Sequence, residues 1–241
     1  MCYISRDMQI FFKKHKIFLR VLLVVSTIIL ALFYDALKPK KVLPIYQPSM
    51  VNYELVDSTL QHVKKYHKIA PFSFENQNGK TITQDDYEGK IYIADFFFTT
   101  CPTICPKMTA NMVNIQEEIL NDSTVMLLSY SVTPKIDSVL QLKKYAIEKG
   151  VNDEKWNLLT GNKKEIYTMA RKSYLVVKED GDGGPYDMIH TENFILVDPE
   201  KRIRGFYDGT DTLAMRELLI DLEILKDEFF PSNFIRIALF Q

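Results

Sequence analysis

Two cysteines four residues apart, in the run Cys101-Pro-Thr-Ile-Cys105-Pro, are the side chains of this chain best suited to chemistry. Residues at this spacing share one face of a helix, with Cβ atoms about 5–6 Å apart. Their sulfurs could therefore form a disulfide after a small adjustment, or bind one metal ion together. The chain has three cysteines, too few for a disulfide framework, and we expect Cys2, which is distant in sequence, to be incidental.

The sequence around the pair favours reactive thiols. The pair follows an apolar run at residues 90–99 and precedes residues 106–120, whose apolar side chains recur at three- and four-residue steps. It therefore lies where a buried strand ends and a helix begins. The free N–H groups of a helix start stabilise a thiolate, which is the form that attacks disulfides and binds metals. An inert pair or a static disulfide is the alternative interpretation.

The rest of the chain predicts the elements that must position the cysteines. Strands are expected at residues 72–76, 81–83, 90–99, 125–132, 156–160, 175–178, 193–198 and 203–207. Helices are expected at residues 52–67, 106–120, 137–149, 163–172 and 210–229. Early strands that alternate with helices, followed by a terminal hairpin and helix, predict an α/β, thioredoxin-like fold with an N-terminal hairpin extension.

His190 is the third candidate for the site. In a thioredoxin-like fold, the loop before the terminal hairpin passes beside the cysteine helix, so we expect His190 to approach Cys101 and Cys105. Two thiolates and one imidazole form a soft, three-coordinate set that suits Cu(I) and can also hold Cu(II). Zinc would accept the same donors, with water as a fourth ligand. His62 and His67 are expected to be solvated or structural, because their spacing does not stack them on one helix face.

The segment at residues 17–34 is apolar apart from Arg20, Ser26 and Thr27, and its length suits one transmembrane helix. Residues 1–41 carry a net charge of +6 and the remainder carries −7. The basic residues before the segment predict a cytoplasmic N-terminus and an exported main domain. A cleaved signal peptide is the alternative, although no small-x-small cleavage site is evident. The total charge of −1 argues against nucleic-acid binding.

These patterns predict five regions along the chain. They are a basic cytoplasmic head at 1–16, a transmembrane anchor at 17–37, a linker and lead-in helix at 38–68, the thioredoxin-like domain at 69–228 and an apolar tail at 229–241. The tail is expected to pack onto the domain, with a membrane or partner contact as the alternative. The short segment before the anchor lacks a recognisable transit peptide, which favours the cytoplasmic membrane of a bacterium over a mitochondrial membrane.

Several stretches resemble the Sco/SenC family, whose members take part in the synthesis of cytochrome c oxidase. The resemblance covers about residues 69–225 and is clearest in the core F-x-x-T-x-C-P-x-x-C-P together with the downstream histidine. The matching stretches include FSFENQNGKTITQDDYEGKIYIADFFFTTCPTICPKMT, LLSYSVTP, YAIEKGV, WNLLTG and HTENFILVDPEKRIRGFYDG.

The resemblance implies a thioredoxin-like fold, a single-pass anchor, and copper bound by Cys101, Cys105 and His190. It also implies that the protein is a metallochaperone that helps to build the dinuclear copper site of a respiratory oxidase. The expected partners are the copper-site subunit of that oxidase, another copper chaperone or a thiol reductase, and membrane lipid around the anchor. The main domain is expected on the periplasmic side of the cytoplasmic membrane.

Two departures from the family pattern bear on the site. Many members have an aspartate immediately before the histidine, where this chain has Ile189, so a carboxylate that would support the ligand is missing. The acidic D-P-x-x-D segment reads Thr133-Pro134-Lys135-Ile136-Asp137 here and lacks its first carboxylate. Any role of that segment is therefore in question.

Two other functions compete with copper delivery. A thiol–disulfide oxidoreductase would use Cys101 and Cys105 as a redox pair, although its usual C-x-x-C signature is one residue shorter. A peroxiredoxin-like peroxidase is suggested by the spacing of Thr99 and Cys101, but that interpretation rests on fold analogy. A thiol exchanger does not need a third ligand, so His190 favours the metal-binding interpretation.

Overall fold

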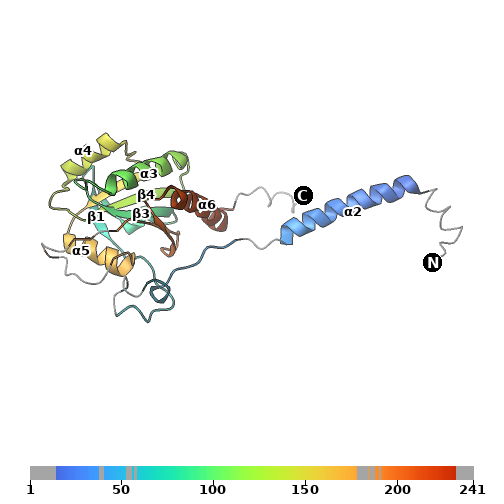
Figure 1. The fold of residues 1–241 in the computed structure, drawn as a ribbon, viewed down its shortest axis with the longest axis horizontal. Coiled ribbons are helices and arrows are strands. Elements are labelled where there is room, and N and C mark those ends of the chain that lie inside the picture. Colours follow the sequence, from blue (N-terminus) through green and yellow to red (C-terminus); the bar gives the residue numbers. More distant parts are fainter. Residues whose placement is uncertain are drawn as a thin grey trace. The chain divides into compact units, whose positions relative to one another are not determined.

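The computed structural model describes residues 15–37, 41–52, 56, 59–177, 184, 188–189 and 191–231. The chain divides into two compact units, residues 1–41 and residues 42–241. In the first unit, helix α2 (Lys16–Leu37) has 22 residues and is long and apolar enough to cross a membrane, judged by length and composition. The second unit contains a mixed sheet with helices on both faces (Figure 1).

Within the described part of the second unit, seven strands form one sheet in the order β2-β1-β5-β4-β3-β6-β7. The strands are β1 (Ser73–Asn76), β2 (Thr81–Thr83), β3 (Ile91–Phe97), β4 (Val125–Ser131), β5 (Trp156–Thr160), β6 (Asn193–Val197) and β7 (Ile203–Asp208). All seven residues of β3 are buried, as its continuous apolar run predicts for a strand covered on both faces. β1 and β2 form the predicted N-terminal hairpin.

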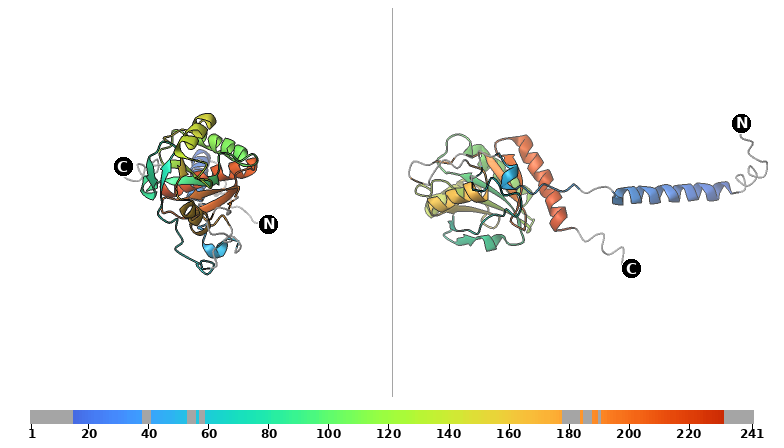
Figure 2. Two further views of the ribbon diagram at one scale, coloured as in Figure 1. Left: turned by 90° about the vertical axis from the view of Figure 1, so that its left-hand side faces the viewer. Right: turned by 90° about the horizontal axis from the view of Figure 1, so that it is seen from below.

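The helices lie in two layers around this sheet (Figures 1 and 2). α3 (Cys105–Glu118), α4 (Val139–Lys149) and α6 (Thr212–Phe229) cover one face. α5 (Lys163–Thr168) and the π-helical turn η4 (Met169–Ser173) cover the other. The core beneath α3 contains both Cys101 and Cys105, whereas the core beneath α5 is rich in buried tyrosine. The α/β, thioredoxin-like fold predicted from the sequence is confirmed.

Strand direction brings the chemically important segments to one edge of the sheet. β3, β4 and β5 run parallel, so their carboxyl ends share that edge. β6 is antiparallel to β3 and therefore begins there, and β7, antiparallel to β6, ends there. The loops that follow β3 and β4, the residues before β6 and the start of α6 are consequently neighbours.

The predicted helix at residues 52–67 is wrong for the residues that the structure describes. Residues 59–62 form a turn, and Tyr66 has a left-handed backbone with φ of 68°. The N–H of Val63 bonds to the carbonyl of Leu60, and its own carbonyl accepts from Ser49 at 3.2 Å. The segment therefore folds back on the linker, which uses the backbone groups that a helix would need.

The predicted strand at residues 175–178 is also wrong for its described residues. Leu175 has a left-handed φ of 58°, and the N–H of Val176 bonds to the carbonyl of Ala170 at 3.1 Å. This wide turn ends η4 and leaves Val176 no N–H for a sheet. Residue 178 lies outside the described residues.

Arg204 of β7 is a fully buried charge that ties the linker and α6 to the sheet. Its guanidinium donates to the carbonyls of Leu43 at 2.9 Å and Pro44 at 3.1 Å. It also pairs with Glu228 of α6 at 2.7 and 3.0 Å and with Asp198 at 3.1 Å. We call this group of five residues the Arg204 clamp.

Replacing Arg204 with methionine should destabilise the fold strongly, because Glu228 and the carbonyls of Leu43 and Pro44 lose the hydrogen bonds of the guanidinium, although Asp198 keeps its ion pair with Arg202. The expected loss in free energy of unfolding is about 3 kcal/mol or more. Trp156 is the only tryptophan of the chain and is buried, so its fluorescence during urea denaturation reports the loss. Arg216→Met, at an exposed position of α6, is the matched control. Equal stability of the two variants would contradict the clamp.

Candidate functional site

The two cysteines lie between the end of β3 and the first turn of α3. Cys105 is the first residue of α3, and Cys101 lies in the loop before it, with its N–H bonded to the carbonyl of Phe98 at 3.3 Å. Both side chains are buried, at 8% and 3% exposure, and both are free thiols. The predicted position of the pair, at the end of a buried strand and the start of a helix, is therefore correct.

The start of α3 differs from those of its neighbours. Side-chain oxygens cap the starts of α4, α5 and α6, supplied by Ser138, Asn162 and Asp211. The N-cap residue of α3, Ile104, makes no such bond. The sulfur of Cys101 instead accepts a hydrogen bond from the backbone N–H of Cys105. A free helix start therefore supplies its N–H group and its partial positive charge to a thiol.

This arrangement lowers the pKa of Cys101. Burial alone would raise the pKa of Cys101. Its sulfur also accepts hydrogen bonds from the N–H groups of Cys105 and Thr103 and bonds to the side chains of the same two residues, and together these lower the pKa by more than burial raises it. The result is a pKa of about 7. The Thr103 hydroxyl lies 3.7 Å from the sulfur. Cys101 is therefore substantially a thiolate at neutral pH, which is the reactive and metal-binding form.

Cys105 has the opposite electrostatic environment. Burial raises its pKa, and the neighbouring Cys101 sulfur and the carboxylate of Asp95 raise it further, against one hydrogen bond from the Phe98 N–H. The pKa reaches about 12. At neutral pH the pair thus consists of a partly ionised thiol, Cys101, and a protonated one, Cys105.

Asp95 is a buried acid of β3 that the sequence analysis did not single out. Its side chain accepts a hydrogen bond from the Ser129 hydroxyl, which in turn accepts one from the Trp156 indole at 2.8 Å. Burial raises the pKa of Asp95 to about 7, despite the bond from Ser129. The sequence did contain a signal for Asp95, since it is the one acidic residue within an otherwise apolar strand. A buried acidic residue usually has a structural or chemical role.

Asp137 fixes the loop that leads to Cys101. Its fully buried carboxylate accepts from the Thr99 N–H at 3.2 Å and the Thr99 hydroxyl at 2.5 Å. It also accepts from the hydroxyls of Ser131 at 2.6 Å and Thr133 at 2.9 Å. Asp137 is the carboxylate that the chain retains from the acidic family segment. The first carboxylate of that segment, replaced by Thr133, is not needed for this contact.

His190 lies outside the described residues, as do Cys2 and all of the glycine-rich loop at 178–187 except Gly184. Its described neighbours Ile189 and Thr191 are buried. Within the described ranges no three His, Cys, Asp or Glu side chains gather as a metal site. The three-ligand set of Cys101, Cys105 and His190 therefore stays a prediction.

Hydrogen bonds connect the chain just after His190 to the cysteine helix. The carbonyl of Glu192 accepts from the Gly209 N–H at 2.7 Å, and the carbonyl of Gly209 accepts from the Asn111 amide of α3 at 2.7 Å. These contacts hold a residue two positions from His190 beside α3. They support the expected approach of His190 to the thiols.

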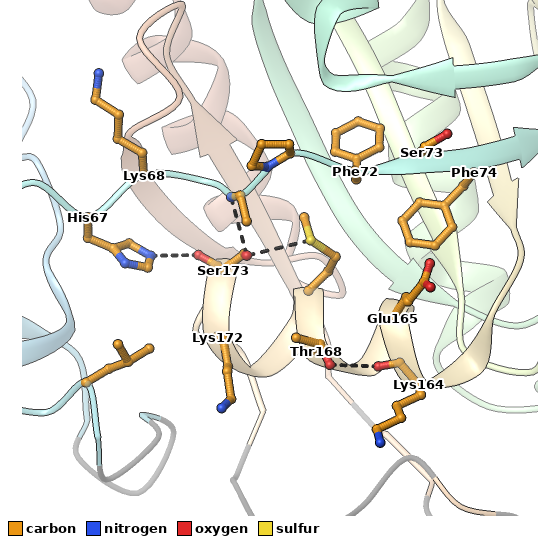
Figure 3. A pocket seen from close by; sticks show the side chains of 14 residues that line it. His67, Lys68, Phe72, Ser73, Phe74, Lys164, Glu165, Thr168, Lys172 and Ser173 are labelled. Atoms are coloured by element: carbon orange, nitrogen blue, oxygen red, sulfur yellow. Dashed lines mark hydrogen bonds between the residues drawn. The ribbon is translucent and has the colours of Figure 1, made fainter.

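A groove of about 880 Å³ lies on the opposite, α5 side of the sheet (Figure 3). Phe72 and Met169 contribute apolar lining, and neither cysteine lines it. The ring of His67 points at Ser173 and donates to its carbonyl at 2.8 Å. Burial lowers the pKa of His67, and the bond to Ser173 offsets this only in part. His67 is therefore a structural residue, away from the thiol chemistry.

Comparison with known proteins identifies the family. Residues 61–222 match the SCO1/SenC family model. The chain belongs to the SCO1/SenC family. The SCO1 protein homolog of Bacillus subtilis is 33% identical over 159 residues, which cover 65% of this chain and 82% of the relative.

Solved structures of this family share the fold. A SCO1/SenC family lipoprotein from Bacillus anthracis superposes with a TM-score of 0.58 and 31% identity, over 66% of this chain and 95% of the other. BsSco is a member of the Sco family of cytochrome c oxidase assembly proteins and is described with a disulfide switch. It superposes with a TM-score of 0.57 and 33% identity, over 66% of this chain and 93% of BsSco. Copper-bound ScoI from Arabidopsis thaliana superposes with a TM-score of 0.51 and 30% identity, over 64% of this chain and 97% of ScoI.

The reduced, metal-free protein should show two very different thiols. Alkylation of Cys101 by iodoacetamide should rise with pH around a midpoint near 7, because the rate follows the thiolate fraction. Cys105, with a pKa of about 12, should stay unmodified at neutral pH. Peptide mass spectrometry between pH 5 and 9 separates the two sites. In the urea-unfolded chain the alkylation midpoints of both cysteines should return to about 8.5. A midpoint of about 8.5 for Cys101 in the folded protein would show that the start of α3 does not lower its pKa.

Asp137→Asn should destabilise the protein. The amide NH₂ group of asparagine is a donor, so it would face hydroxyl and N–H groups of Thr99, Ser131 and Thr133 that now donate to the carboxylate. The expected loss in free energy of unfolding is about 1–3 kcal/mol, measured by urea denaturation with Trp156 fluorescence. Asp227→Asn, at an exposed position of α6, is the matched control and should be neutral. An Asp137→Asn protein as stable as the control would show that the carboxylate does not hold the loop.

Proposed function

We propose that this protein binds copper through Cys101, Cys105 and His190 and delivers it during assembly of the dinuclear copper site of a cytochrome c oxidase. The observation that carries the proposal is the pair of free, adjacent thiols at the uncapped start of α3. Thiolate and imidazole are the donors that copper prefers, so the residues fit this cargo. Family membership and the copper-bound Arabidopsis relative support the same conclusion.

The two thiols would play different parts in metal capture. Cys101, with a pKa of about 7, is already partly ionised at neutral pH and provides the first ligand. Cys105 holds its proton and must release it when the metal binds. Copper affinity should therefore rise with pH, since each bound ion displaces this proton. A receiving site can draw the ion away as the thiol recovers a proton.

We further propose that α2 anchors the protein in a bacterial cytoplasmic membrane, with residues 1–16 inside and the domain on the periplasmic side. The length and composition of α2 and the basic residues before it support this topology. Expected partners are the copper-site subunit of the oxidase and a second copper chaperone or thiol reductase that supplies metal or electrons.

Disulfide exchange is the second candidate function, favoured by the pKa difference between the cysteines and by the disulfide switch of BsSco. The Cys101 thiolate would attack a disulfide of the partner, forming a mixed disulfide and releasing one partner thiolate. Cys105 would then lose its proton and attack Cys101. This step forms the Cys101–Cys105 disulfide and frees the second partner thiol, so two electrons pass to the partner.

The decisive test is an anaerobic Cu(I) titration of the reduced protein beside the His190→Ala variant. One tight equivalent is expected, with affinity reduced at least about tenfold in His190→Ala because one of three ligands is lost. His62→Ala, at an exposed histidine of the described surface, is the matched control and should bind as the unaltered protein does. Cys101→Ser and Cys105→Ser should each abolish tight binding.

The outcomes separate the two functions. Unchanged affinity in His190→Ala would remove that residue from the site. Absence of tight copper binding, while Cys101 and Cys105 still cycle between dithiol and disulfide with a model peptide, would reject copper delivery in favour of disulfide exchange.

A further inference from the structure

The groove on the α5 side of the sheet has two walls and an apolar floor (Figure 3). One wall is the segment at residues 67–73, which leads into β1, and the other is formed by α5 and η4. The side chains of Phe72, Phe74 and Met169 are buried between the walls and form the floor. The volume of about 880 Å³ lies within the range of roughly 300–1,000 Å³ that is usual for ligand pockets. We call this feature the α5 groove.

Exposed lysines lie along both walls of the α5 groove. Lys68 belongs to the first wall, and Lys164 and Lys172 project from the helical wall in Figure 3. Glu165 is the one acidic side chain among the described residues that line the groove, so three positive charges and one negative give the lining +2. Residues 42–241 as a whole contain 22 basic and 29 acidic residues, a net charge of −7. The groove is therefore a basic surface on an acidic domain.

The α5 groove is preformed and part of its charge is unpaired. The N–H of Ala70 donates to the Ser173 hydroxyl at 3.4 Å, and the ring of His67 donates to the Ser173 carbonyl at 2.8 Å, so the two walls are joined at one end. Lys68 and Lys164 form no ion pair with any residue that the structure describes. A ligand can thus enter without rearranging the walls, and it meets ammonium groups that have no competing partner.

The spacing of the lysines indicates which kind of ligand fits. Lys164 and Lys172 are eight residues apart, with Thr168 midway, so their backbone positions lie about 12 Å apart at 1.5 Å per residue. A single anionic headgroup would reach both ammonium groups only if both side chains turned toward each other. In an extended chain, residues i and i+4 are about 13 Å apart, and residues i+1 and i+3 point to the opposite side. Two acidic residues at that separation, with apolar residues between them, match both the lysines and the floor.

We propose that the α5 groove binds an extended segment of a partner protein in which two acidic side chains, four residues apart, flank apolar ones. The apolar side chains would cover Phe72 and Met169, and the carboxylates would pair with the lysines of the walls. Cys101 and Cys105 belong to the core on the α3 side of the sheet, and neither lines the groove. A partner docked here would leave the thiols uncovered. The inference goes beyond copper delivery and disulfide exchange and requires neither.

The test is fluorescence anisotropy of the labelled peptide GSEVTVESG with the full chain in nanodiscs. Lys68→Glu and Lys164→Glu should each weaken binding about tenfold, because each substitution replaces an attraction by a repulsion. Lys144→Glu, the same change of charge at an exposed position of α4, is the matched control and should bind as the unaltered protein does. Binding should also weaken as salt is added, since the paired charges are exposed.

Three further probes separate the possible occupants. The neutral peptide GSQVTVQSG should bind about tenfold more weakly than GSEVTVESG. GSESTSESG keeps the charges but lacks the valines, and it should also bind more weakly because the floor is apolar. Sodium octanoate represents a lipid-like anion, and displacement of the labelled peptide at a lower concentration than unlabelled GSEVTVESG needs would assign the groove to an amphiphile instead. Absence of peptide binding, or equal affinity in the three lysine variants, would overturn the proposal. No step uses copper, so the result is independent of the Cu(I) titration.

Discussion

A single buried carboxylate determines where the reactive thiol lies. Asp137 bonds to Thr99 after β3 and to Ser131 at the end of β4, and so joins two loops that leave the sheet at the same edge. β3 and β4 are parallel neighbours, so the carboxylate has only one strand spacing to bridge. Without it, a loop with exposed side chains at residues 102–103 would have little to hold Cys101 against the start of α3.

The difference between the two cysteines follows from that placement. Cys101 lies just outside the helix and receives N–H groups that no capping side chain has taken. Cys105 is inside the helix, in the core, near the buried carboxylate of Asp95. Four positions along the chain separate an ionised sulfur from a protonated one. A site of this kind suits both metal transfer and thiol exchange, since each requires one group that attacks and a second that completes the reaction.

The sequence predicts those parts of the fold in which one pattern dominates. The buried run of β3, the amphipathic α3 and the hairpin of β1 and β2 are all correct to within two residues, because hydrophobic period and turn chemistry agree there. The predictions for residues 52–67 and 175–178 are wrong because the backbone makes left-handed turns at Tyr66 and Leu175. Neither residue is a glycine, so the sequence shows only the apolar spacing there and gives no sign of the turn. The cysteine pair could be recognised from spacing and context. Asp95 was signalled only as one acidic residue in an apolar strand. The contacts of Asp95 and Asp137 could not be predicted, because their partners Ser129 and Thr99 are 34 and 38 residues away in the sequence.

The Arg204 clamp also sets an order of events in biosynthesis. Leu43 precedes Arg204 by 161 residues, and Glu228 lies in the last described helix. Contacts between such distant positions form late, since the intervening chain must first be ordered. The linker emerges from the ribosome before β7 and α6, and it can dock only after both of these elements have been made. Until then Arg204, Asp198 and the apolar surface that Leu43 covers stay open to water, and the unfinished domain is at its most vulnerable to aggregation and proteolysis.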